Sequence, residues 1–304
     1  MQVFSTRKDK PHIYPFLRPS DDWTKYVDFE PIEFSISPDG SSWSSIYDQP
    51  DLEGVLCYIH TPAPVAQEDT TEKIGLKNGQ EFHSSSYSTR DITMGIHFRG
   101  LNEADAYLAF DELQKFLDSR DPYWICWSDI PTRMYKVRAK FATPTFIGDH
   151  NWTCQIALTD LNGLSRSVGT TADFDNSNMV EGFGNNQPVD LPTYTFTSSE
   201  FTVQNLSDIM IDPERRGTPL TIKLEGKANG DMTIQNTTTG DSITRHGGWS
   251  GTWSLVDVNP MLNGTNDGIN TDHGIITLAK GSNSIKVSGF SGKVTFDFPL
   301  WWKL

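Results

Sequence analysis

The sequence is poor in cysteine, and its three cysteines form no recognisable set. Cys57, Cys126 and Cys154 are odd in number and have no CxxC spacing, so neither a disulfide framework nor a cysteine metal site is indicated. Each lies in an apolar run typical of a strand, such as GVLCYIH or WTCQIAL. We therefore expect three buried, free thiols in a reducing compartment.

Long apolar runs are also missing. No stretch reaches the roughly 18 consecutive apolar residues that a transmembrane helix requires, so no membrane partner is expected. The N-terminal residues carry positive charges but no apolar segment, which argues against a secretory signal peptide. The sequence thus predicts synthesis in a cytoplasm, with any export by another route.

Positive charge is scarce. Against 39 acidic residues stand 25 Lys and Arg residues, which gives a formal net charge of −14. Specific nucleic-acid binding is therefore not expected, because it needs a basic surface that neutralises phosphates. Two interpretations of the acidity stay open: ordinary solubility, and a surface past which DNA slides without adhering because like charges repel.

The motifs of common catalytic sites are absent as well. The sequence contains no GxSxG, HExxH, GxGxxG or GxxxxGK[ST] run, and its seven histidines include no i, i+4 pair. Residues 263–274 alternate Asn, Asp and Gly like a calcium loop but lack its closing Glu, which favours a polar loop. The acidic pairs Asp111–Glu112 and Asp173/Asp175 leave glycoside hydrolysis as an alternative. We predict no catalytic, cofactor-binding or metal-binding residue, and no enzymatic activity.

What the sequence does contain is strand alternation, interrupted by one helical segment at residues 102–119. The apolar stripe of this segment consists of Ala106, Phe110, Leu113 and Leu117. Asn102 is a suitable N-cap residue, and Asp105 stands where a reciprocal capping carboxylate belongs. Pro122 limits the C-terminal end. The pattern predicts one amphipathic helix that lies on a sheet.

Residues 61–90 are polar and too numerous for an ordinary loop between two elements. Asn78-Gly79 is a hairpin turn signal within them. We interpret the segment as an extended arm, and an arm without its own core needs something to pack against.

Composition divides the chain into four parts. Residues 1–30 hold scattered prolines and no sustained period, which indicates an irregular N-terminal arm. Residues 31–163 hold alternating strands and the helix, and residues 164–200 have the Gly, Asn, Ser and Pro content of a linker. In residues 201–304 turn signals recur about every ten residues, the spacing of a β-sandwich. The predicted fold class is mainly β: an N-terminal β-sandwich or barrel with one α-helix, and a C-terminal β-sandwich.

The tryptophans of the C-terminal part admit two interpretations. Trp249 and Trp253 have rings that suit stacking on sugars, as in a carbohydrate-binding module. Alternatively they fill the core of the sandwich while Trp301 and Trp302 anchor the last strand. The sequence favours the core but leaves saccharide stacking open.

Two blocks of the sequence carry a family resemblance. The first is EKIGLKNGQEFHSSSYSTRDITMGIHFRG, followed by the helix and by DPYWICWSDIPTRMYKVRAKF, which includes the run Pro131-Thr132-Arg133-Met134-Tyr135. The second is GTPLTIKLEGKANGDMTIQNTTTGDSI with the ending VTFDFPLWW. In this order they resemble the distal tail protein (Dit) family of siphophages that infect Gram-positive bacteria. The likeness covers about residues 70–160 and 215–304; the chain departs from the family in its long start and in lacking a large C-terminal insertion.

The resemblance implies a tail-tube-like N-terminal domain and a galectin-like or carbohydrate-module-like C-terminal domain. It implies a structural protein of the phage tail tip or baseplate, usually in six copies, whose ring joins the tail tube to the tail-tip hub and to host-recognition proteins. A sheet would line the ring, the helix would cover the sheet's outer side, and the acidic balance would suit a channel for DNA.

The implied partners are further copies of this chain, the tail tube protein, the tail-tip hub or tail-associated protein, the tape measure protein, and receptor-binding or baseplate proteins. No cofactor is implied. The implied location is the distal end of the tail in the virion, after synthesis in the host cytoplasm. The arm would reach a neighbouring subunit, with interface residues Lys77, Asn78, Gly79, Phe82, Tyr87 and Arg90. The alternative function is a virion-borne binder of cell-wall saccharide that uses Trp249 and Trp253.

Overall fold

The computed structural model describes residues 1–13, 26–27, 29–61, 63–176 and 192–303. These divide into two compact units: unit 1 is Met1–Ser165 with the C-terminal Lys303, and unit 2 is Arg166–Trp302. Parts of the predicted N-terminal arm (residues 14–25 and 28) and of the predicted linker (residues 177–191) lie outside the described residues.

Unit 1 is built on an antiparallel sheet with the strand order β4-β3-β9-β10-β12-β8-β5. The strands are β3 (Phe34–Ser37), β4 (Ser44–Ser45), β5 (Val55–Thr61), β8 (Arg90–Arg99), β9 (Tyr123–Trp127), β10 (Arg133–Phe141) and β12 (Asn151–Asp160). The short β11 (Thr145–Phe146) pairs with β12, and β1 (His12–Ile13) pairs in parallel with β2 (Tyr26–Val27). The short 3₁₀ helices η2 (Ile46–Asp48) and η3 (Pro50–Leu52) lead into β5.

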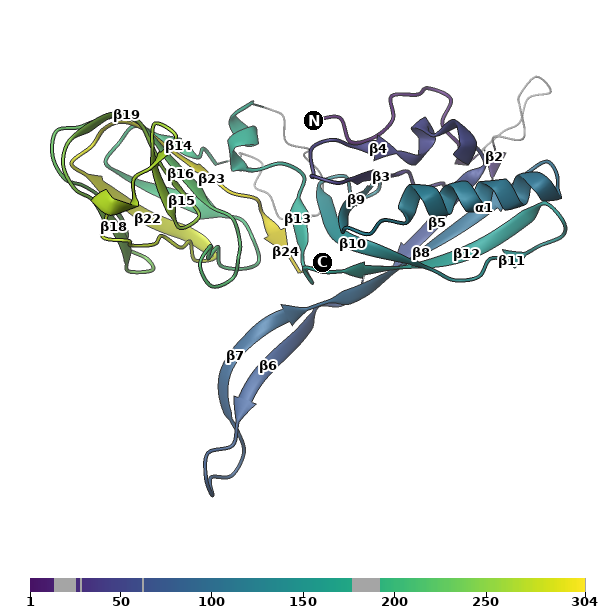
Figure 1. Ribbon diagram of the computed structural model, residues 1–304, viewed down its shortest axis with the longest axis horizontal. Coiled ribbons are helices and arrows are strands. Elements are labelled where there is room, and N and C mark those ends of the chain that lie inside the picture. The colour runs from purple at the N-terminus through teal and green to yellow at the C-terminus, as the bar shows by residue number, and fades with distance from the viewer. Residues whose placement is uncertain (14–25, 28, 62, 177–191, 304) are drawn as a thin grey trace. The chain divides into compact units, whose positions relative to one another are not determined.

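Helix α1 (Glu103–Leu117) lies along one face of this sheet, and a two-stranded arm leaves the unit on the other side (Figure 1). Asn102 caps the helix: its side-chain oxygen accepts a hydrogen bond from the backbone N–H of Asp105 at 3.0 Å. The Asp105 carboxylate in turn accepts the backbone N–H of Leu101 at 2.8 Å, one residue before the position that a standard capping box uses. These bonds satisfy N–H groups that would otherwise lack partners at the helix start.

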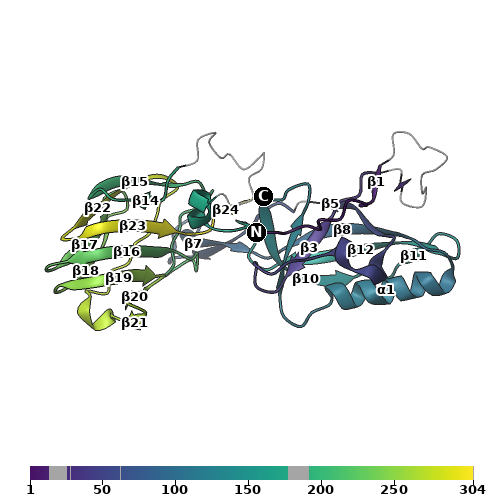
Figure 2. The same cartoon turned by 90° about the horizontal axis from the view of Figure 1, so that it is seen from above.

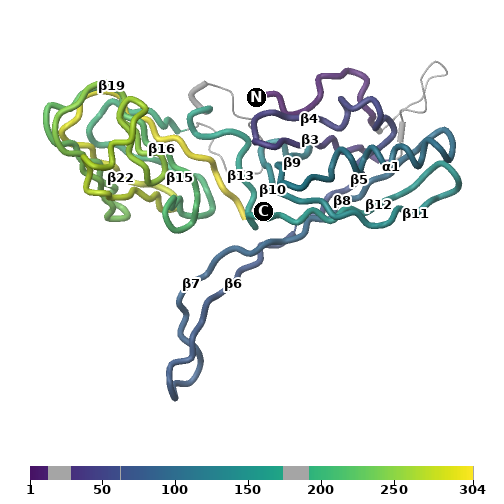
Figure 3. Tube along the Cα trace, in the orientation of Figure 1, coloured from purple at the N-terminus to yellow at the C-terminus, as the bar shows by residue number. Residues whose placement is uncertain are grey.

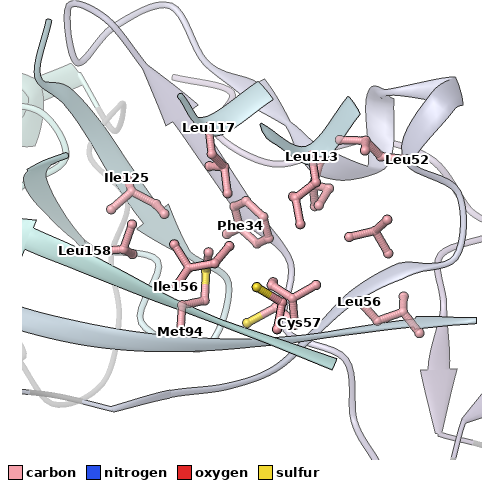
Figure 4. Close-up of a cluster of buried hydrophobic side chains, with 14 of the residues drawn as sticks. Phe34, Leu52, Leu56, Cys57, Met94, Leu113, Leu117, Ile125, Ile156 and Leu158 are labelled. Carbon is pink, nitrogen blue, oxygen red and sulfur yellow. The ribbon is translucent and has the colours of Figure 1, made fainter. Parts of the chain in front are cut away.

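The core of unit 1 lies between α1 and the sheet. Leu113 and Leu117 point from the helix toward Phe34, Met94 and Ile156 (Figure 4). The predicted stripe is buried, except that Phe110 is half-buried, and one further residue joins the buried side chains, Ala109. The Phe110 ring packs edge-on against Phe141 and Trp152. All three cysteines, Cys57, Cys126 and Cys154, are buried and free, as predicted.

Unit 2 is a β-sandwich of a six-stranded sheet, β14-β23-β16-β19-β20-β21, and a four-stranded sheet, β15-β22-β17-β18. The first sheet consists of β14 (Thr195–Phe196), β23 (Ser291–Asp297), β16 (Thr221–Ala228), β19 (Trp249–Val256), β20 (Asn259–Leu262) and β21 (Thr265–Asn266). The second consists of β15 (Glu200–Asn205), β22 (Gly281–Ser288), β17 (Met232–Asn236) and β18 (Asp241–Arg245). The strands β23, β16 and β19 run side by side in Figure 2.

The short strand β13 (Ser165–Ser167) pairs with β24 (Trp301–Trp302), and the 3₁₀ helices η4 (Thr171–Asn176) and η5 (Gly268–Asn270) complete the elements. Alternate residues of both sheets, such as Leu224, Ile234 and Phe296, are buried between them. The prediction of a mainly β fold, with one α-helix in the described part of the chain, is confirmed.

Candidate assembly surface

The arm consists of β6 (Ala66–Glu72), β7 (Glu81–Ser88) and the connection between them. Among the described strands, β6 and β7 pair only with each other. Figure 3 shows this hairpin extending away from the rest of unit 1. Asn78 and Gly79 lie in the connection, where the sequence places a turn. Gly75 and Gly79 have φ values of 53° and 83°, in the left-handed region that favours glycine, so the connection depends on both.

Apolar side chains gather near the distal end of the arm. Leu76 is fully exposed, Phe82 is 60% exposed and Ile74 is 42% exposed. A two-stranded hairpin alone is marginally stable in water, and here no core covers these side chains. The distal end of the arm is therefore a surface that gains stability when another apolar surface packs on it.

The strands of the arm are acidic. They carry Glu68, Asp69, Glu72 and Glu81 and no Lys or Arg, whereas Lys73 and Lys77 lie in the connection. The Glu72 carboxylate contacts the His83 ring at 3.1 Å. The charge of the arm thus changes sign along its length.

The root of the arm is a buried ion pair. The Arg90 Nε donates to the Asp160 carboxylate at 3.0 Å, and both side chains are almost completely buried. The Arg90 Nη1 donates to the backbone carbonyls of Ala63 at 2.7 Å and Lys303 at 2.8 Å. The same guanidinium lies 5.8 Å from the centre of the Tyr135 ring. Arg90 therefore ties the start of β8 to the chain on both sides of the arm.

The residues that the sequence predicts for an oligomer interface occupy three different places. Lys77, Asn78, Gly79 and Phe82 lie together at the exposed distal part of the arm. Tyr87 is half-buried near the root, with the Lys303 ammonium 5.9 Å from its ring centre. Arg90 is buried in unit 1 itself.

Sequence reasoning missed two apolar residues beside this group, Ile74 and Leu76. Their signal is present in the run KIGLK, where two large aliphatic residues interrupt a polar segment. Single exposed aliphatic residues are common, but several grouped near one loop tip favour a contact surface.

The two candidate residues for saccharide stacking are buried in unit 2. Trp253 has no exposed surface, and its indole Nε1 donates to the Asp267 carboxylate at 3.1 Å. Trp249 is 7% exposed, and its ring stacks on Phe290 with centres 5.6 Å apart. This burial does not favour stacking of a sugar on either ring, because neither offers an open face.

The loop that resembles a calcium site uses its carboxylates within the fold. Asp267 accepts a hydrogen bond from Arg245 Nε at 3.0 Å, and Asp272 accepts the backbone N–H of Thr244 at 3.0 Å. Among the described residues, no three His, Cys, Asp or Glu side chains are grouped as metal ligands. Nor does the described part of the chain contain a helix long and apolar enough to cross a membrane.

Comparison with known proteins finds similarity to proteins of phage tails. Residues 55–151 match the family model of the phage tail protein RIFT-related domain, a span that runs from β5 through the arm and α1 to the start of β12. The fold is similar to that of the Dit protein of phage SPP1, described as a paradigm of the hub adsorption apparatus in phages that infect Gram-positive bacteria. The TM-score is 0.62 at 17% identity, over 88% of this chain and 99% of that chain.

A chain of the phage P2 baseplate in its activated conformation with Ca matches with a TM-score of 0.42 at 12% identity, over 88% of this chain and 98% of that chain. No curated protein sequence matches. The resemblance to distal tail proteins is thus confirmed for the fold and, over residues 55–151, for a phage tail domain.

Proposed function

We propose that this chain is a structural, non-enzymatic component of a phage tail tip that assembles into a ring of identical copies. The observation that carries the proposal is the exposed arm, which lies inside the span that matches a phage tail family. The similarity of the fold to SPP1 Dit supports the same role.

The arm supports assembly with further copies of the chain. Each copy has one arm with unpaired strand edges and exposed apolar residues at its distal end. If every copy extends its arm onto the next, the contact is head-to-tail, and a head-to-tail contact that closes generates a ring. The family resemblance sets the expected number at six.

Within the ring, the sheet of unit 1 faces the central channel and α1 lies outside it. The channel carries DNA from the tail tube toward the host, and the tape measure protein is a further partner. The neighbours along the tail are the tail tube protein on one side and the tail-tip hub, with receptor-binding or baseplate proteins, on the other. The location is the distal end of the tail in the virion.

Shortening the arm tests the proposal. We expect the full chain to form rings with a central channel in negative-stain electron microscopy, and a multimeric mass in light scattering. Replacing residues 66–86 with a short Gly-Ser linker removes the unpaired edges and the apolar distal end but leaves the core of unit 1 intact. The shortened chain should therefore be folded by circular dichroism and monomeric by mass.

A pair of point variants controls for general surface effects. Leu76→Ser on the arm should weaken assembly, whereas Ile269→Ser, at a residue 92% exposed in unit 2, should leave the mass unchanged. Rings formed by the shortened chain would show that the arm is not the contact. A full-length chain that stays monomeric would contradict self-assembly into a ring.

A further inference from the structure

The whole chain has a net charge of −14, yet one strand of unit 1 carries a row of basic residues. Strand β10 runs Arg133-Met-Tyr-Lys-Val-Arg-Ala-Lys-Phe141, and Val137, Ala139 and Phe141 belong to or pack on the core beneath α1. Because successive side chains of a strand point to opposite faces, Lys136, Arg138 and Lys140 lie on the other face. We call these three residues the basic stripe.

The face around the basic stripe is polar and open. In register with Arg138 lie Thr159 of β12 and Asp91 of β8, and in register with Lys140 lie Ala157 and Thr93. On this face, the described strands β8, β10 and β12 carry one acidic residue, Asp91. Its carboxylate accepts a hydrogen bond from the Thr159 hydroxyl at 2.7 Å. The face therefore has an excess of positive charge.

Two of the three cations have no partner in the part of the chain that the structure describes. Arg138 and Lys140 are exposed and form no hydrogen bond or ion pair with the described residues. The Lys136 ammonium lies 5.9 Å from the centre of the Trp124 ring. Arg138 and Lys140 are thus available to neutralise an external anion, with Lys136 beside them.

The spacing of the basic stripe suits a regular polyanion. Alternate residues of a strand are about 6.6–6.8 Å apart, so the three cations form a row about 13 Å long. Each strand of double-stranded DNA carries one negative charge per about 3.4 Å along the helix axis, so such a row spans several phosphates.

We propose that the basic stripe contacts the phosphate backbone of double-stranded DNA without sequence preference. This rests on the proposed function, in which the face opposite α1 lines the channel. A row of three cations in a protein of net charge −14 binds weakly, and weak electrostatic contacts let DNA slide. The stripe therefore holds the DNA weakly in the channel. In this respect the channel surface differs from the purely repulsive surface that the net charge of the chain suggests.

The test compares DNA binding by the full chain and by Lys136→Gln/Arg138→Gln/Lys140→Gln. The probe is a fluorescein-labelled 20-base-pair duplex of arbitrary sequence, followed by anisotropy at 50 and 200 mM salt. Three phosphate contacts predict that the affinity of the full chain falls about 40-fold between these two salt concentrations. The triple variant should bind at least about tenfold more weakly at 50 mM salt and lose most of this salt dependence.

Unit 2 offers a matched control, because the outer face of its six-stranded sheet also carries three cations near one acidic residue. Lys223 and Lys293 pair with Glu225 there, at 2.9 and 3.2 Å, and Lys227 lies on the same strand as Lys223. Lys223→Gln/Lys227→Gln/Lys293→Gln should leave DNA binding unchanged. An equal loss in both triple variants would mean that net charge alone acts, and would overturn the proposal.

Ring formation by each variant separates this inference from the proposed function. Rings of the full chain that bind no DNA at 50 mM salt, or a stripe variant that binds as tightly as the full chain, overturn the stripe and leave the ring standing. Loss of rings in the stripe variant would assign the stripe to another occupant, the acidic arm of a second copy. Absence of rings in the full chain overturns the ring, whatever the DNA result.

Discussion

At the scale of single residues, burial controls the chemistry of this chain. Burial raises the pKa of the Cys57 thiol to about 12 and also raises the pKa of the Cys126 and Cys154 thiols above their ordinary value. A buried thiolate loses its hydration, so the neutral thiol is favoured. Since the thiolate is the reactive form, these cysteines are inert near neutral pH.

We expect no alkylation of the folded chain by iodoacetamide at pH 8, and three labelled cysteines in denaturant, as measured by mass spectrometry. The raised pKa of Cys57 also makes the stability of the fold depend on pH. The neutral thiol is stabilised in the fold, so its contribution is complete below about pH 9 and is lost as the pH rises toward 12. Rapid labelling of Cys57 in the folded chain would contradict this placement.

Loss of the Arg90 side chain should strongly destabilise unit 1. Arg90→Ala leaves the Asp160 carboxylate buried without its partner and frees the two carbonyls that the guanidinium joins. Removing one member of a buried pair typically lowers the free energy of unfolding by about 3–5 kcal/mol. Denaturant unfolding should show this loss for Arg90→Ala, and no comparable loss for Arg138→Ala, whose side chain is exposed. Equal effects would show that the buried pair is not special.

At the scale of elements, helix α1 offers an internal comparison. Leu113 has no exposed surface and belongs to the core, whereas Leu108, on the opposite side of the same helix, is 63% exposed. Leu113→Ala should therefore lower the free energy of unfolding by about 2–5 kcal/mol, the cost of lost burial plus a cavity.

The control variant Leu108→Ala removes the same atoms from the same helix with the same change of helix propensity. It should change the free energy of unfolding by less than about 0.5 kcal/mol. Denaturant unfolding of both variants measures the difference. If the two losses are similar, the helix contributes through its own propensity and not through its contact with the sheet.

The elements with a strong local pattern could be predicted from sequence. The helical period and Asn102 indicate α1, which spans Glu103–Leu117, and the polar composition of residues 61–90 indicates the hairpin. The burial of Ala109 was not predicted, because a small residue adds little to an apolar stripe. In the structure Ala109 belongs to the core. Side-chain burial at Arg90 and Trp253 depends on partners at Asp160 and Asp267, which are distant in sequence and invisible to a local pattern.

At the scale of the whole molecule, the net charge conceals the arrangement of charges. The sum of −14 suggests a repulsive surface toward DNA, yet the strands of the arm hold acidic residues while the face of β10 holds the basic stripe. The run MYKVRAKF shows strand alternation in the sequence. The sequence does not show which face of this strand α1 covers. That choice decides whether three cations are buried or exposed, and it is set by packing between distant segments.

The exposed arm also limits how long an unassembled chain stays whole. Lys73 and Lys77 lie in the connection between β6 and β7, where every residue from 73 to 80 is exposed and no core holds the backbone. Exposed loop tips are the sites that proteases cut first. Cleavage there should sever the hairpin while α1 and the sheet remain folded. A nicked copy would then keep the fold of unit 1 but lose the contact surface of the arm. In the proposed ring a neighbouring copy covers the arm, so assembled copies should be cleaved there more slowly than free ones.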